Sequence, residues 1–240
     1  MEQTIHLLAI DLQSVSSAAR DAFAMSIDEL TLLSMKARGE GSDIEVVILC
    51  DDERFEIYTT ESARPTVFRA VLGTIVARMP TELRATVRTT ELLGVAAAWH
   101  LMHLTTGESG RSGVRVLGEL NDAVVRARRA GTLGSELTAL FDCSVNTGFR
   151  IQSETTLGDP ETSRVQHELD AFEAERIIEE ELVTWQASRA SQGSVQSIVP
   201  KGLDPSYYAA AEPGSSVRLR ACRSGELLPL SEPSARRGVA

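Results

Sequence analysis

A group of charged side chains lies between two apolar stretches at residues 49–58, whose sequence is LCDDERFEIY. Three acidic residues and one arginine form this group: Asp51, Asp52, Glu53 and Arg54. Carboxylates and a guanidinium at the end of a buried strand can carry out acid–base chemistry or hold a polar substrate. The same pattern is also typical of a solvated turn that joins two strands of a hairpin. The residue types therefore leave two interpretations, an active site and a hairpin tip.

Two histidines and three cysteines are the other side chains that could do chemistry. His100 and His103 are three residues apart on an expected helix, a spacing that can chelate a metal if a third ligand is present. The sequence shows no third ligand, so we expect no metal site. The cysteines Cys50, Cys143 and Cys222 form no metal-ligand pair and are typical of a reduced, cytoplasmic compartment. Cys50 ends the apolar run VVILC, which predicts a buried structural thiol.

The charge of the chain limits its partners. With 34 acidic and 24 basic residues the net charge is −10, which argues against a protein that wraps nucleic acid by bulk electrostatics. Four arginines still form a positive tract on one expected helix: Arg115, Arg126, Arg128 and Arg129. This tract is either a solvated face or a local contact for tRNA phosphates. The apolar runs are too short to cross a bilayer, and the first three residues (MEQ) are acidic where those of a signal peptide would be basic, so we expect no signal peptide and no membrane partner.

The elements that must position these side chains predict an α+β fold. A length of 240 residues suits one good-sized domain with extra segments. Strand-like runs occur at residues 4–12, 44–50, 55–60 and 85–89. Apolar spacings of three and four predict helices at residues 16–38, 66–79, 91–105, 114–130 and 133–154. We therefore expect a small antiparallel β-sheet with helices and a helical bundle.

A long helix is expected after Asp159 and Pro160, which together form a good cap-plus-proline start. It carries a narrow apolar stripe among many glutamates: Val165, Leu169, Phe172, Ile177, Leu182 and Trp185. Such a helix usually packs against a partner helix, and a lone surface helix is the alternative. Residues 191–240 are rich in Ser, Gly and Pro without periodicity, which predicts a mostly flexible tail.

The stretch 49–58 resembles a motif of glutamyl-tRNA reductase, the first enzyme of the tetrapyrrole pathway in most bacteria and plants. That family has Leu-Ser-Thr-Cys-Asn-Arg-Thr-Glu-Ile-Tyr at this place. When the two are laid together without gaps, five residues match: Leu49, Arg54, Glu56, Ile57 and Tyr58. The nucleophilic cysteine of the family falls on Asp52.

Further matches follow in the same order along the chain. Residues 20–30 (RDAFAMSIDEL) resemble the family's Arg-Glu-x-Leu-Ala-Phe-Ser-x-Glu-Glu-Leu, and residues 100–102 fall on its His-Leu-Phe. Residues 117–134 resemble Leu-Gly-Gln-Val-Lys-Asp-Ala-Tyr, continuing into Ala-Gly-Thr-Val-Gly, and residues 140–158 end like Arg-Thr-Glu-Thr-x-Ile-Gly. The resemblance thus implies a reductase-like N-terminal domain over residues 1–158, followed by a dimerisation-type helix over 159–190 and the tail over 191–240.

The remainder of the family's pattern differs from this sequence. The family continues into an NADPH-binding domain with a Gly-x-Gly-x-x-Gly turn, and no strand followed by such a turn occurs after Gly158. Residues 175–189 resemble instead the start of the family's dimerisation helix. The resemblance therefore implies that these residues bind no NADPH, and that the chain forms a homodimer or heterodimer through residues 160–190.

The resemblance also implies roles for single residues. In the family the arginine of the motif contacts the substrate and the histidine assists the chemistry. The candidate catalytic residues are accordingly Asp52, Arg54 and His100. The candidate substrate-binding residues are Glu56, Ser14 and Arg115. A salt bridge to the neighbouring acids is the alternative for Arg54, and helix packing is the alternative for His100.

Three functions are compatible with these observations, and we favour the first. A non-reducing paralogue would bind aminoacyl-tRNA and transfer or hydrolyse its acyl group, because Asp52 is a poorer nucleophile than a thiolate whereas ester cleavage needs only positioning, a base and oxyanion stabilisation. Such an enzyme would be an acyl transferase or hydrolase rather than an NADPH-dependent reductase. A pseudoenzyme would instead pair with a full-length reductase and regulate it. A haem or small-ligand module would use His100 or His103 as an axial ligand.

Overall fold

The computed structural model describes residues 4–39, 43–107, 113–157 and 163–192. Within these ranges four strands form one antiparallel sheet: β1 (Ile5–Asp11), β2 (Val46–Cys50), β3 (Arg54–Thr60) and β4 (Thr90–Leu93). Their order in the sheet is β2-β3-β1-β4, so that the hairpin β2–β3 forms one side and β4 forms the opposite edge. The predicted α+β class with a small antiparallel sheet is confirmed.

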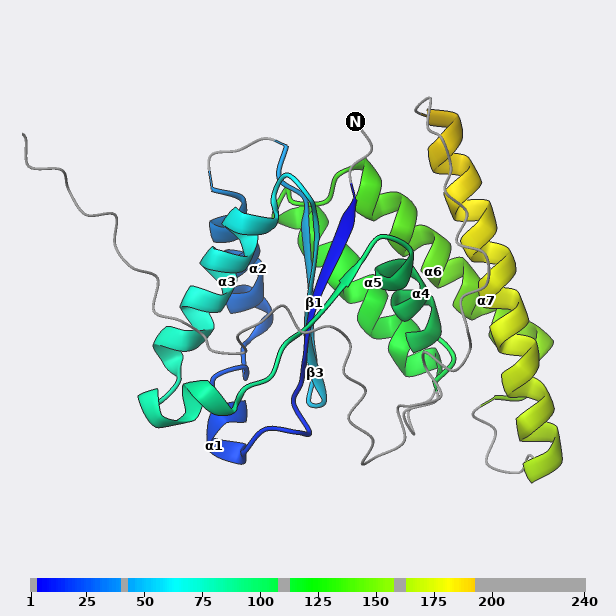
Figure 1. Cartoon of the computed structure of the whole chain (residues 1–240), viewed down its shortest axis with the longest axis horizontal. Coiled ribbons are helices and arrows are strands. Elements are labelled where there is room, and N and C mark those ends of the chain that lie inside the picture. Colours follow the sequence, from blue (N-terminus) through cyan, green and yellow to red (C-terminus); the bar gives the residue numbers. More distant parts are fainter. Residues whose placement is uncertain (1–3, 40–42, 108–112, 158–162, 193–240) are drawn as a thin grey trace, which may run out of the picture.

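Helices cover both faces of this sheet (Figure 1). They are α1 (Ser17–Arg20), α2 (Ile27–Arg38), α3 (Arg64–Arg78), the 3₁₀ turn η1 (Thr81–Thr86), α4 (Val95–Leu104), α5 (Gly113–Arg129), α6 (Ser135–Glu154) and α7 (Arg164–Gln192). Helices α2 and α3 lie on one face, and the bundle α4–α7 lies on the other. Successive side chains of a strand point to opposite faces, so Leu7 of β1 joins the core under the bundle whereas Leu8 joins the core under α2 and α3.

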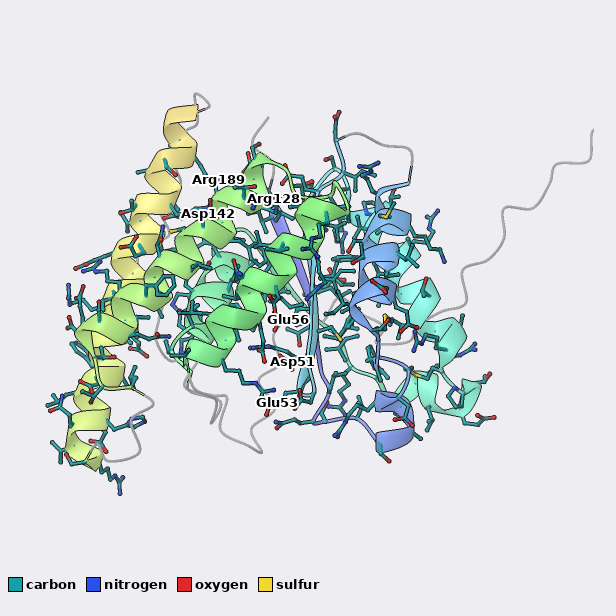
Figure 2. All side chains as sticks on the ribbon, turned by 180° about the vertical axis from the view of Figure 1, so that it is seen from behind. Asp51, Glu53, Glu56, Arg128, Asp142 and Arg189 are labelled. Atoms are coloured by element: carbon teal, nitrogen blue, oxygen red, sulfur yellow. The ribbon has the colours of Figure 1, made fainter. Side chains whose placement is uncertain are left out.

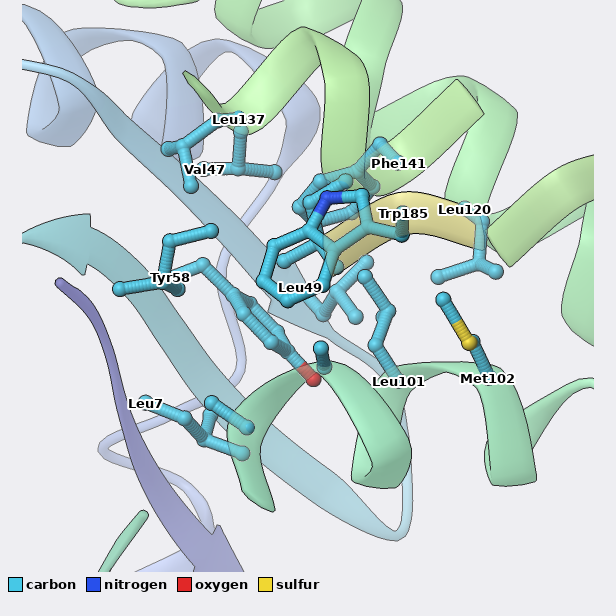
Figure 3. Close-up of a cluster of buried hydrophobic side chains, with 14 of the residues drawn as sticks. Leu7, Val47, Leu49, Tyr58, Leu101, Met102, Leu120, Leu137, Phe141 and Trp185 are labelled. Atoms are coloured by element: carbon cyan, nitrogen blue, oxygen red, sulfur yellow. The ribbon is translucent and has the colours of Figure 1, made fainter. Parts of the chain in front are cut away.

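The core under the bundle positions the site (Figure 3). Tyr58 of β3 is fully buried there, and its ring meets Phe141 of α6 edge-on at 5.3 Å between centroids. Trp185 of α7 closes the same cluster from the far side of the bundle. Because both faces of the sheet are buried, β1 and β2 read as nearly continuous apolar runs rather than as alternating ones.

Two predicted elements were wrong. The single helix over 16–38 is two helices, because Ser26 begins a new one: its hydroxyl accepts from the Glu29 backbone N–H while the Glu29 carboxylate accepts from the Ser26 N–H. The strand predicted at 85–89 is also wrong. Residues 81–86 form η1, and the strand that pairs with β1 is β4, where a helix over 91–105 was expected. Pairing with the open edge of β1 outweighs local propensity there.

Helix α7 confirms the expectation of a long helix after the domain. Ser163 precedes its first turn, and the Ser163 hydroxyl accepts from the Gln166 N–H. The predicted start at Asp159 and Pro160, and most of the predicted tail 191–240, lie outside the described residues. The second part of the helix is packed into the core through Ala174, Ile177, Ile178, Leu182 and Trp185. The first part exposes its apolar residues. No helix in the described ranges is long and apolar enough to cross a membrane.

Candidate active site

Three alternate side chains of β3 face the helical bundle: Arg54, Glu56 and Tyr58. The two-residue period of a strand places them in a row, about 6–7 Å apart along it. Tyr58 lies in the core, Glu56 meets α4 through His100, and Arg54 meets α5 through Glu119. The row therefore leads from the interior of the molecule to the end of the β2–β3 hairpin, where Asp51 and Glu53 lie (Figure 2).

Asp51 holds the hairpin turn in shape. Its carboxylate accepts from the backbone N–H groups of Glu53 at 2.7 Å and Arg54 at 3.0 Å. The Asp51 carboxylate also accepts from Arg54 Nε at 2.9 Å, and the Asp51 N–H donates to the Arg54 carbonyl at 3.1 Å. Asp51 therefore stabilises the turn, as the hairpin-tip interpretation of this acidic group predicts.

Ion pairs connect the turn to α5. Arg54 Nη2 lies 3.2 Å from the Glu119 carboxylate, and Arg115 Nε lies 3.0 Å from the same carboxylate. Arg115 also reaches Asp52 at 3.4 Å. Asp52 is the most solvent-accessible member of this group, with 76% of its side chain exposed. Two of the predicted site residues, Asp52 and Arg115, therefore meet at the rim of the turn.

A cavity of about 290 Å³ lies between the turn, α5 and the start of α2. Its walls combine charged, apolar and thiol groups: Ile27, Leu49, Cys50, Asp51, Asp52, Arg54, Glu119, Leu120, Asp122 and Arg126. Arg126 also donates from Nη2 to the Ile48 carbonyl at 3.2 Å, which fixes α5 against β2. The volume is just below the roughly 300–1,000 Å³ typical of ligand sites.

Glu56 is a buried carboxylate with two polar partners. It is 2% exposed, accepts from the Tyr58 hydroxyl at 2.9 Å and lies 3.0 Å from His100 Nε2. Burial raises the pKa of Glu56, but its contacts with His100, Arg54 and Tyr58 lower it by more, so that the pKa lies below its ordinary value. Burial and the neighbouring Glu56 raise the pKa of Tyr58. The carboxylate is therefore ionised at neutral pH and the phenol is not.

Cys50 does not present a thiolate to the cavity. Its Sγ donates to the Phe23 carbonyl at 3.4 Å, and burial together with the charge of Asp51 raises its pKa to about 11. Cys143 on α6 has a pKa raised to about 11 by its burial beside Glu181. Neither thiol is therefore activated as a nucleophile. The third cysteine, Cys222, lies outside the described residues.

The other predicted site residues lie apart from the cavity. Ser14 follows β1, and its hydroxyl donates to the Asp11 carbonyl at 2.7 Å. His103 stacks on Trp99 at 4.4 Å, whereas His100 turns toward Glu56. No group of three or more His, Cys, Asp or Glu side chains in the described ranges is placed to hold a metal ion.

Four charged residues of the cavity wall were not among the predicted site residues. They are Asp51, Glu119, Asp122 and Arg126. Glu119 follows Arg115 by four positions, a spacing that pairs opposite charges on a helix and could have identified it. The nearness of α5 to the turn is a tertiary feature, and no local pattern in the sequence indicates it.

The turn 130–134, between α5 and α6, fixes these elements relative to the sheet. Gly131 has a φ of 67°, in the left-handed region that favours glycine. The buried Thr132 hydroxyl donates to the Val46 carbonyl at 2.8 Å, and the Val46 N–H donates back to the Thr132 carbonyl at 2.9 Å. The Glu45 carboxylate accepts from the first N–H groups of α6, including that of Leu137 at 2.8 Å. This turn thus attaches the bundle to β2.

The chain is similar to proteins of one known family. The sequence matches the family model described as glutamyl-tRNA(Glu) reductase, N-terminal domain, over residues 8–155. It is 28% identical over 155 residues to glutamyl-tRNA reductase 2 of a Nocardioides species, covering 63% of this chain and 34% of that protein. The structure is similar to glutamyl-tRNA reductase from Methanopyrus kandleri, with a TM-score of 0.49 and 21% identity over 68% of this chain and 37% of the other. The chain thus spans about a third of the length of these relatives. It belongs to the family of the glutamyl-tRNA reductase N-terminal domain.

Proposed function

We propose that this protein binds the aminoacyl end of a charged tRNA and transfers or hydrolyses the acyl group without reducing it. One observation carries the proposal: the wall of the cavity combines carboxylates and guanidiniums with a thiol that is protonated and hydrogen-bonded to a backbone carbonyl. Reduction through a thioester needs a thiolate, and the position of the family's cysteine holds Asp52. Cleavage of an ester by water or an amine needs a base and positive charge near the carbonyl, which such a wall supplies.

Asp52 and Arg54 have different roles in this proposal. Asp52, at the exposed rim, accepts a proton from the attacking group or holds the ammonium of the aminoacyl residue. Arg54, held between Asp51 and Glu119, places a guanidinium beside the ester carbonyl. Arg115 adds charge at the entrance, where the tRNA phosphates would arrive. The protein would act in the cytoplasm, where charged tRNA is present.

Two measurements with radiolabelled glutamyl-tRNA test this proposal. Retention on a filter by the protein reports binding, and loss of the acid-precipitable label reports cleavage of the ester. We expect the protein to retain charged tRNA better than uncharged tRNA and to accelerate loss of the label. Asp52→Ala should slow that loss by about 10- to 100-fold, because it removes one hydrogen bond between charged groups of the protein and the substrate. Asp142→Ala, an exposed acid on α6 outside the cavity, is the matched control. A protein that neither retains nor deacylates charged tRNA would refute the proposal.

A second candidate function rests on the first part of α7. Val165, Leu169 and Phe172 follow one face at spacings of four and three, and they are 69%, 59% and 71% exposed. An apolar helix face of this kind usually has a partner. We infer that it pairs with a second copy or with a full-length reductase, as the regulator hypothesis requires.

Mass measurement in solution and a pull-down with a full-length reductase separate these two partners. Leu169→Glu with Phe172→Glu should abolish whichever association exists. Val114→Glu, at an equally exposed apolar position on α5, should not. A monomer that also captures no reductase would remove this second candidate.

A further inference from the structure

The buried carboxylate of Glu56 has no role in the function proposed so far. It lies beneath the bundle with 2% of its surface exposed, too deep to meet a substrate directly. An ionised carboxylate is costly to bury unless polar partners compensate it. Glu56 has two such partners, the Tyr58 hydroxyl and His100 Nε2, and Arg54 lies one strand repeat away on the same face. Because burying this charge costs free energy, the position of Glu56 calls for a functional explanation.

The contact with His100 fixes how the imidazole carries its proton. A carboxylate can only accept hydrogen bonds, so the 3.0 Å contact requires a proton on His100 Nε2. In the neutral ring the lone pair then resides on Nδ1. The His100 side chain is 28% exposed while Glu56 is buried, so solvent reaches the ring away from the carboxylate. This is the arrangement in which an orienting acid prepares an imidazole to act as a base.

Glu56 and His100 do not line the cavity, but Glu56 is next to residues of its wall. Glu56 is the register partner of Leu49, whose side chain forms part of the cavity wall. Arg54, in the same wall, is two residues before Glu56 on the same face of β3. Arg54 and the carboxylate that holds His100 therefore belong to one strand and lie about 6–7 Å apart along it.

We propose that Glu56 is a positioning residue that orients His100 as the general base of the proposed acyl-tRNA cleavage, so that Asp52 has the second of its two roles and holds the ammonium of the aminoacyl residue. Glu56 holds Nε2–H, and Tyr58 holds Glu56 in place. His100 Nδ1 takes a proton from water as the water oxygen attacks the ester carbonyl. The bond from the carbonyl carbon to the ribose oxygen then breaks, and the ribose oxygen receives the proton from Nδ1. The products are a free amino acid and uncharged tRNA, with no redox change. This inference rests on the proposed function.

Kinetics of radiolabelled glutamyl-tRNA deacylation by the full chain test the role of Glu56. Glu56→Gln should lower kcat by about 10- to 100-fold while KM changes less than about 3-fold, because the residue acts through His100 and not on the substrate. Arg54→Lys should instead raise KM. Glu56→Asp, which keeps the charge on a shorter side chain, should recover part of kcat. Glu91→Gln, an exposed acid on β4, should leave both values unchanged.

A second readout does not depend on activity. In ¹⁵N NMR of the wild-type protein at neutral pH, we expect His100 to carry its proton on Nε2. Tyr58 donates to position 56, so a glutamine there would turn its NH₂ group toward His100, and we expect the proton to move to Nδ1. The wild-type measurement needs no variant, so the inference stays testable even if Glu56→Gln does not fold.

The results distinguish a failure of the positioning role of Glu56 from a failure of the proposed function. If the wild type deacylates and Glu56→Gln keeps its kcat within about 2-fold, the positioning role is refuted and the proposed function stands. A wild-type His100 with its proton on Nδ1 also refutes the positioning role. If the wild type neither binds nor deacylates charged tRNA, both fail together.

Discussion

Two turns of this molecule resemble motifs of the same family, but one lines a cavity and the other stabilises the fold. The turn 50–54 joins β2 to β3, exposes Asp52 and forms part of a cavity wall. The turn 130–134 joins α5 to α6, and its polar groups are committed to the fold: Thr132 bonds β2 and Glu45 caps α6. Retained motif residues therefore do not by themselves mark a site. Burial and partners distinguish the turn that holds the molecule together from the one that faces a ligand.

Exchange of Asp52 for cysteine gives the largest expected effect. Asp52 is exposed, whereas Cys50 is half-buried and its partial burial, with the charge of Asp51, raises the pKa of its thiol to about 11. In an Asp52→Cys variant, iodoacetamide at pH 8 should modify position 52 at least about 100-fold faster than Cys50, because the thiolate is the reactive form. Peptide mass spectrometry in a Cys222→Ser background measures both rates. Equal rates would mean that the two positions of the first turn do not differ as described.

The second turn should respond through stability. Gly131→Val forces a β-branched residue into the left-handed region and brings its Cβ to 2.6 Å from Arg38 Nη1, which donates to the Gly131 carbonyl. We expect the free energy of unfolding to fall by about 2 kcal/mol. Gly73→Ala, on α3 where an added Cβ meets nothing within 4 Å, should raise it by about 0.5–1 kcal/mol. Urea denaturation measures both, and a loss at Gly73 or none at Gly131 would contradict the structure.

Gly134→Ala tests the cap supplied by Glu45. An added Cβ would lie 2.3 Å from the Glu45 carboxyl carbon, so the carboxylate must leave the start of α6. The loss of a cap should cost about 1–2 kcal/mol. In a Glu45→Ala background the same substitution should cost almost nothing, since the carboxylate that it displaces is gone. Additive effects in this double-mutant cycle would show that Gly134 and Glu45 act independently.

Acid should lower the free energy of unfolding more through the buried Glu56 of β3 than through an exposed carboxylate. The folded state holds the pKa of Glu56 below its ordinary value of 4.5, so the unfolded chain binds more protons there and stability falls as pH drops through this range. Glu56→Gln should therefore flatten the dependence of unfolding free energy on pH between about pH 5 and pH 3. Glu29→Gln removes a carboxylate whose pKa is lowered by hydrogen bonds to Ser26 and Arg78 but which is exposed, and it should flatten the curve less. An unchanged slope in Glu56→Gln would contradict the paired state of this carboxylate.

Much of the site could be predicted because strands alternate. Arg54, Glu56 and Tyr58 share one face of β3 for the simple reason that they are two residues apart. The apolar run VVILC predicted a buried structural thiol at Cys50, and the structure instead leaves this residue half-buried at the end of β2, with its thiol hydrogen-bonded to the Phe23 carbonyl. The roles of Asp52, Arg54 and His100 in chemistry remain predictions.

Other parts needed contacts that no local pattern encodes. The break before Ser26 was detectable, since Glu29 follows it at the capping-box distance, but the apolar spacing through Phe23 suggested one continuous helix. β4 could not be distinguished from the start of α4, because only the open edge of β1 makes those residues a strand. The pairing of Arg54 with Glu119, 65 positions apart, depends on the packing of α5 against the hairpin.

The sequence by itself determined the fold class, the row of side chains on β3 and the membership of a family whose cysteine position holds aspartate here. These follow from local periodicity and from motifs, which are properties of neighbouring residues. Only the tertiary structure decided which acid closes the turn, which one is exposed, and that Glu56 is buried against His100. The reason is physical. Burial and pairing set the charge state and the reach of a side chain, and both depend on residues brought together from distant parts of the chain.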